Sequence, residues 1–223
     1  MIRIWKRFRT SLLALPLAAG GTLAPACETA LLLAMDVSNS VDPREYRIQT
    51  EGLAAALADP AIAETLVQGR SAVAVLQWSG RGMQAMAIPW TRIAGPTDVA
   101  ALAEAARAMP RAFVGGNTAI GEALAVGTTR FGAVGDCHRW ILDISGDGPE
   151  NAGTALATAS RAAERRGITV NGLAIESLGR AITSYYERVL ITPDGFVETA
   201  KGFTDFARAI RAKILREISQ VTG

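Results

Sequence analysis

The chain has 223 residues, of which 49% are hydrophobic and 20% are charged. This length suits one well-buried α/β domain and is short for two. The formal net charge is +2, but four basic residues lie within the first nine positions, and without them 19 basic residues face 21 acidic ones. No cluster of Lys and Arg with interleaved aromatic residues occurs in that remainder, which argues against a nucleic-acid-binding protein.

The first 26 residues have the three parts of a secretory signal peptide. A basic head is followed by a short apolar run at 11–19 and by the small-x-small pattern Ala24-Pro25-Ala26. We therefore predict that residues 1–26 are removed on export and that 27–223 form a single domain in the periplasm or outside the cell. A retained anchor needs about 20 apolar residues, more than this run has, so we expect no membrane span in the mature form. Lipidation of Cys27 is an alternative that the pattern disfavours, because Leu23 stands four positions before it instead of three.

Apolar segments along the rest of the chain predict a series of strands. The continuous apolar run at 29–35 is typical of a strand that is buried on both faces of a parallel sheet. Further strands are predicted at 71–78, 84–90, 139–144, 168–175 and 196–199. Only residues 79–83 separate the second strand from the third, and a parallel crossover takes a dozen or more residues. We therefore expect these two strands to form an antiparallel hairpin.

Helices are predicted between the strands from capping residues and apolar periodicity. The first starts after Asp42, with Pro43 at the first helical position, and stops at Asp59-Pro60. Others are predicted at 97–109, at 118–131, from the SGDGPEN loop through 166, at 181–190, and from 203 onward. The alternation of strands and helices predicts a doubly wound, Rossmann-like α/β fold whose sheet is mostly parallel with one antiparallel edge strand.

Two cysteines remain after the predicted signal, and an isolated pair in an oxidising compartment more often forms a disulfide than a metal site. Cys27 lies nine residues before Asp36, and Cys137 lies ten residues before Asp147. If the two aspartates meet at the carboxyl ends of neighbouring parallel strands, the cysteines meet at the opposite ends, so we predict a Cys27–Cys137 disulfide. The one histidine, His138, excludes a two-histidine zinc site.

Three turns at strand-to-helix connections carry oxygen-bearing side chains. The DVSNS turn supplies Asp36, Ser38 and Ser40, the GGNT turn supplies Thr118, and the GDG turn supplies Asp147. Ligands of open α/β sheets bind outside the carboxyl ends of the strands, so the three turns should converge on one crevice. Each turn taken alone is also what ordinary turn and capping chemistry produces. Together they form an all-oxygen set, which suits a hard cation such as Mg²⁺ and does not suit zinc or copper.

These motifs resemble the metal-ion-dependent adhesion site of a von Willebrand factor A (VWA) domain, and the resemblance covers essentially all of residues 28–220. The chain is also similar to a bacterial group of exported, single-domain proteins of this type. The resemblance implies that Ser38, Ser40 and Thr118 ligate Mg²⁺, or Mn²⁺ in its place and less readily Ca²⁺. It also implies that Asp36 and Asp147 bind the cation directly or through water.

The leading functional hypothesis is an exported module that captures an Asp or Glu carboxylate of a protein or peptide through this cation. The alternative is a metal-assisted phosphate-ester hydrolase that uses the same crevice. Hydrolases of the aspartyl-phosphate type place an Asp-x-Asp turn after the first strand and a lysine nearby. Here Ser38 occupies the second acidic position, and the lysines after the signal, Lys201 and Lys213, come late in the chain. No nucleophile and base pair is apparent, so we favour binding without catalysis.

Overall fold

A computed structural model of the chain describes residues 27–177 and 179–219, and the predicted signal peptide lies outside this part. The strands form a six-stranded sheet in the order β3-β2-β1-β4-β5-β6. They are β1 (Thr29–Asp36), β2 (Ala72–Trp78), β3 (Gln84–Arg92), β4 (Arg139–Gly146), β5 (Ile168–Ile175) and β6 (Val197–Ala200). The helices are α1 (Pro43–Leu57), α2 (Pro60–Gln68), α3 (Pro96–Arg107), α4 (Ile120–Arg130), α5 (Leu156–Glu164), α6 (Ala181–Val189) and α7 (Phe206–Ser219), with the 3₁₀ turns η1 (Phe131–Val134) and η2 (Phe203–Asp205).

The sheet has the predicted mixture of pairings. β1 pairs in parallel with both β2 and β4, and the parallel pairing continues from β4 to β5 and from β5 to β6. β3 runs antiparallel to β2 at one edge, so the hairpin expected from the short 79–83 link is confirmed. The α/β fold class with one antiparallel edge strand is confirmed with it.

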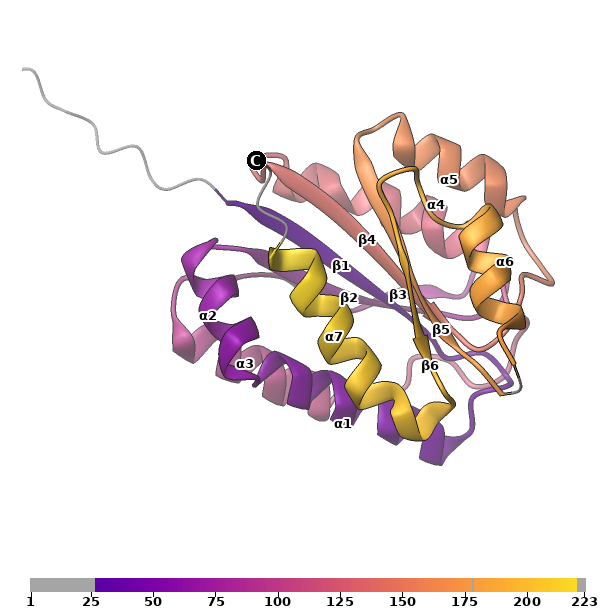
Figure 1. Cartoon of the computed structure of the whole chain (residues 1–223), viewed down its shortest axis with the longest axis horizontal. Helices are drawn as coiled ribbons and strands as arrows, with labels where there is room; N and C mark the ends of the chain where they lie inside the picture. Colours follow the sequence, from indigo (N-terminus) through magenta and orange to yellow (C-terminus); the bar gives the residue numbers. More distant parts are fainter. Residues whose placement is uncertain (1–26, 178, 220–223) are drawn as a thin grey trace, which may run out of the picture.

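Helices cover both faces of this sheet (Figure 1). α1, α2, α3 and α7 lie on one face, and α4, α5 and α6 lie on the other. Each face of the sheet has its own hydrophobic core, and successive residues of β1 point alternately into the two. Leu31 and Leu33 belong to the core under α1 and α7, and Leu32 belongs to the core under α4. That explains the unbroken apolar run at 29–35. Within the described residues no helix is both long enough and apolar enough to cross a membrane.

One helix, α2, was not predicted from the sequence. The Asp59-Pro60 pair ends α1 as expected, but it also begins α2, because Asp59 Oδ1 accepts hydrogen bonds from the backbone N–H groups of Ala61 and Ile62 at 3.0 and 3.4 Å. Proline at the first helical position needs no hydrogen-bond partner for its nitrogen. Ile62 and Leu66 then anchor α2 in the core.

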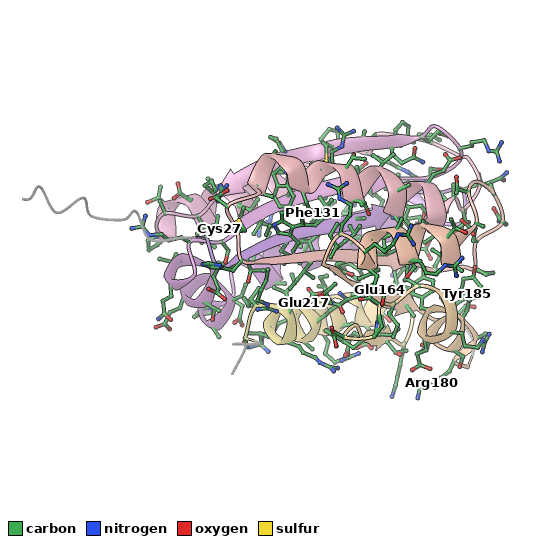
Figure 2. All side chains as sticks on the ribbon, turned by 90° about the horizontal axis from the view of Figure 1, so that it is seen from above. Cys27, Phe131, Glu164, Arg180, Tyr185 and Glu217 are labelled. Atoms are coloured by element: carbon green, nitrogen blue, oxygen red, sulfur yellow. A yellow bond between two sulfur atoms is a disulfide. The ribbon has the colours of Figure 1, made fainter. Side chains whose placement is uncertain are left out.

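The predicted disulfide is confirmed. Cys27 and Cys137 are joined, with their Cα atoms 4.4 Å apart, at the amino ends of β1 and β4. The N–H of His138 donates to the carbonyl of Cys27 at 2.9 Å and continues the pairing of the two strands. Figure 2 shows Cys27 at one end of the sheet and Tyr185 and Arg180 at the other. The disulfide therefore fixes the end of the sheet opposite the carboxyl ends of the strands.

A cluster of buried charged residues joins α7 to the sheet and explains Asp143, a strand residue that no sequence motif accounts for. Lys213 Nζ lies 2.7 Å from Asp143 Oδ1 and also pairs with Glu217 on its own helix. Glu217 Oε1 in turn accepts a hydrogen bond from Asn171 Nδ2 of β5 at 2.8 Å. These four side chains are at most 2% exposed. Burial raises the pKa of Asp143, although the Lys213 ammonium opposes the shift.

Candidate metal centre

The candidate site lies at the topological switch point of the sheet. Asp36 ends β1, and Asp147 directly follows β4, the neighbouring strand. The helix after β1 covers one face of the sheet and the helix after β4 covers the opposite face. This divergence opens a crevice at the carboxyl edge, where α/β proteins bind their ligands.

Four of the five predicted ligands are linked by hydrogen bonds. The backbone N–H of Ser38 donates to Asp36 Oδ1 at 2.7 Å, and the hydroxyl oxygens of Ser38 and Ser40 are 3.1 Å apart. The hydroxyl of Ser40 donates to Asp147 Oδ1 at 2.7 Å, across 107 positions of sequence. The structure thus brings the DVSNS and GDG turns together, and their binding of a metal stays a prediction.

Thr118, the fifth predicted ligand, lies in the loop beside them. The N–H of Asn39 donates to the carbonyl of Gly116 at 3.1 Å, which joins this loop to the DVSNS turn. Asn151 fixes Thr118 itself, since its Oδ1 accepts from the N–H of Thr118 at 2.8 Å and its own N–H donates to the carbonyl of Thr118 at 3.0 Å. Within the described residues the hydroxyl of Thr118 makes no hydrogen bond to the other four side chains.

Arg111, which the sequence did not mark as functional, supports the DVSNS turn. Its Nη2 donates to the carbonyl oxygens of Val37 and Ser38, both at 2.9 Å. Its guanidinium carbon also lies 5.9 Å from the ring centroid of Tyr46 on α1, so the side chain is held on two sides. By binding these two carbonyl oxygens, Arg111 fixes the backbone between Asp36 and Ser40 and so orients the candidate ligands on it.

The Asp36 carboxylate is fully buried. Burial is the largest cause that raises its pKa to about 7, and the hydrogen bond from Ser38 N–H opposes this shift. Oδ1 has that hydrogen bond, but Oδ2 has none within the described residues. A buried carboxylate oxygen without a partner is costly. A cation bound at this oxygen would supply the missing partner and favour the ionised form.

A glycine keeps the space beside this oxygen open. A Cβ added at Gly146 would lie 3.1 Å from Asp36 Oδ2 and 2.7 Å from the hydroxyl oxygen of Tyr186 on α6. The buried hydroxyl of Tyr186 is also without a hydrogen-bond partner in the part of the chain that the structure describes. Burial, followed by the charge of Asp36, raises the pKa of Tyr186 well above its usual value. The tyrosine therefore stays protonated and can donate a hydrogen bond into this space.

The donor set has few carboxylates. Among the described residues no group of three or more His, Cys, Asp and Glu side chains is placed to hold a metal ion. Any cation here would depend on hydroxyl oxygens and water in addition to Asp36 and Asp147. Mg²⁺ commonly binds in this way, through one or two carboxylates with several retained waters. The residues present therefore fit a hydrated hard cation.

A model of the family described as "Protein of unknown function (DUF1194)" matches residues 26–222. The chain belongs to DUF1194. No curated protein matches this DUF1194 member.

Solved structures resemble the DUF1194 chain over most of its length. Proximal thread matrix protein 1 from the mussel byssus has a TM-score of 0.66 at 21% identity, covering 86% of this chain and 48% of that one. The von Willebrand factor type A protein from Catenulispora acidiphila has a TM-score of 0.60 at 20% identity, covering 86% and 43%. The pilus adhesin SpaC from Lactobacillus rhamnosus GG has a TM-score of 0.65 at 16% identity, covering 87% and 30%. The DUF1194 chain thus spans less than half of each protein, and its fold is that of a VWA domain.

Proposed function

We propose that this protein is an exported binding module that holds one divalent cation at the candidate metal centre and uses it to capture a carboxylate of a protein or peptide ligand. The buried Asp36 carboxylate carries the proposal. Its Oδ2 lacks a partner within the described residues, and hydrogen bonds connect Asp36 through Ser38 and Ser40 to Asp147. A purely structural turn gains nothing from leaving such an oxygen unpaired.

The five side chains divide into two kinds of ligand. Asp36 and Asp147 would supply negative charge, and Ser38, Ser40 and Thr118 would supply neutral hydroxyl oxygens. Because three of the five are neutral, the cation keeps an affinity for one further carboxylate. Mg²⁺, with oxygen ligands at about 2.0–2.1 Å, or Mn²⁺ in its place, suits this small set better than Ca²⁺, which takes 6–8 oxygens. In one structure of the mussel protein, zinc occupies the MIDAS motif, which supports a divalent cation in this fold.

Export to the periplasm or the outside of the cell is part of the proposal. The Cys27–Cys137 disulfide supports it, because disulfides persist mainly in oxidising compartments. The predicted signal at 1–26 agrees with it, although these residues lie outside the described part. That one structural relative is a pilus adhesin supports protein binding as the activity.

We favour binding over phosphate-ester hydrolysis. Lys213, one of the two late lysines, is paired with Asp143 and Glu217 on the α7 face of the sheet. The other, Lys201, lines a cavity that Asp147 also lines, so it is Ser38 at the second acidic position that argues against an aspartyl-phosphate enzyme.

The hydroxyl of Ser40 donates a hydrogen bond to Asp147. Because the proposed cation would bind Asp147 as well, this carboxylate would not be free to act as a base for Ser40. No observation at the site singles out a nucleophile with a base of its own among the described residues.

Metal-dependent capture from the native surroundings tests this function. The natively exported protein should retain a partner from its cell envelope or growth medium in the presence of Mg²⁺ and release it when a chelator is added. Asp147→Ala should lose the partner while staying folded, because Asp147 lies in a surface loop. Asp194→Ala, which removes an exposed aspartate from another loop, should retain it. A partner retained equally in chelator, or equally by Asp147→Ala, would contradict the proposal.

A further inference from the structure

A cavity of about 590 Å³ opens directly from the candidate metal centre. Ser40 and Asp147, two of the predicted ligands, belong to its lining. The first two turns of α1, the end of β5 with the two residues after it, and the segment that leads from β6 into η2 form the rest of its lining. Figure 1 shows the starts of α1 and α7 meeting at the end of the sheet to which the parallel strands point. A ligand bound at the metal centre would thus have this cavity beside it.

The acidic side chains of the cavity wall already have hydrogen-bond partners. Asp42 Oδ1 accepts from the N–H of Glu45 at 2.7 Å, and Glu45 Oε2 accepts from the N–H of Asp42 at 2.8 Å, which is a capping box at the start of α1. Glu176 Oε1 accepts from the N–H and the hydroxyl of Thr183 at 2.7 and 2.8 Å. These carboxylates therefore accept hydrogen bonds at the N-termini of α1 and α6, where the helix macrodipole also favours negative charge.

The basic side chains of the wall are placed differently. Arg44 and Lys201 line the cavity and are exposed, and within residues 27–177 and 179–219 neither side chain makes an ion pair or a hydrogen bond. An arginine offers five N–H donors and a lysine offers three. Ile48, Ile175 and Phe203 supply an apolar part of the same lining. The cavity thus combines these two uncommitted cations and an apolar surface with four carboxylates, of which Asp42, Glu45 and Glu176 are engaged at helix starts and Asp147 belongs to the candidate metal centre.

We propose that this cavity receives a second acidic group of the ligand, so that the preferred partner is a peptide segment with two acidic side chains. This inference rests on the proposed function, in which the cation takes the first carboxylate. Arg44 and Lys201 take the second, and an apolar side chain between the two acidic residues packs on Ile48 and Phe203. The cation alone would accept any carboxylate, and these two residues make the site selective for diacidic segments.

Peptide titrations followed by NMR test the inference, because they also detect weak binding. The probes are acetylated, amidated peptides with one Asp, and peptides in which two, three or four residues including leucine separate an Asp from a Glu. In Mg²⁺ the best diacidic peptide should bind several-fold more tightly than the monoacidic one. Arg44→Gln and Lys201→Gln should each reduce this advantage by about twofold to fivefold, the range for exposed ion pairs, and leave the affinity for the monoacidic peptide unchanged.

The controls separate this inference from the function on which it rests. Arg47→Gln removes an exposed cation from the same helix but outside the cavity, and it should keep the full diacidic advantage. If the monoacidic peptide binds only with Mg²⁺ but the diacidic peptides bind no more tightly, or keep their advantage in both cavity variants, the second subsite is wrong and the metal-dependent function stands. If no peptide binds in a metal-dependent way, the function and the subsite are both overturned.

Discussion

Replacement of Lys213 by methionine should lower the free energy of unfolding by about 3–5 kcal/mol, the usual effect of removing one partner from a buried charge cluster. Methionine keeps most of the aliphatic length of lysine and removes the charge. Asp143 and Glu217 would then face each other without a counter-charge at a place from which water is excluded. One of the two carboxyl groups would have to take up a proton, and that cost reduces stability.

Urea unfolding followed by circular dichroism measures this loss. Lys201→Met is the matched control, because Lys201 is exposed and a surface substitution changes stability by only about 0.5 kcal/mol. A triple variant with Asp143→Leu, Lys213→Met and Glu217→Met should recover much of the loss, since apolar replacement of a whole buried cluster is often neutral. A loss of less than about 1 kcal/mol in Lys213→Met would show that the cluster does not hold α7 to the sheet.

Loss of the disulfide should have an effect of similar size. The double variant Cys27→Ser and Cys137→Ser should unfold with a free energy lower by roughly 4–5 kcal/mol. The reason is that the bond closes a loop with a sequence separation of 110 and restricts the unfolded chain accordingly. The two strand ends stay paired through the His138 N–H bond to the carbonyl of Cys27, so the folded structure itself should change little.

Urea unfolding of the oxidised protein and the double variant, both kept free of reductant, checks this value. Reduced wild-type protein should match the double variant, which separates the effect of the bond from that of the serine side chains. Equal stability of the oxidised protein and the double variant would mean that the bond does not constrain the unfolded state.

The fold was predictable because local signals agreed with the tertiary structure. The apolar run at 29–35 reports burial on both faces, and the short link at 79–83 leaves only a hairpin. The missed α2 has a local cause, since Asp59 and Pro60 are at once a helix stop and a helix start. The Asp59-Pro60 pair was interpreted only as the end of α1, so its second role as the start of α2 was missed.

The site was predictable only where its residues form motifs. The DVSNS and GDG turns have recognisable spacing, and the structure brings them together. Arg111, Asn151 and Tyr186 are single residues in unremarkable sequence, and their importance depends on contacts made across the fold. The buried cluster at Asp143 was hidden for the same reason, because its partners lie on a different strand and on the last helix.

Calorimetric titration of Mn²⁺ tests the central claim most directly. Wild-type protein and the Asp194→Ala control should bind one Mn²⁺, and Asp36→Ala and Asp147→Ala should bind it at least about 100-fold more weakly, since even outer-shell substitutions cost 10–100-fold. Circular dichroism of each variant confirms that the fold is intact. Equal Mn²⁺ affinity in all four proteins, or no binding by the wild type, would contradict the account and leave the DVSNS and GDG turns with a purely structural role.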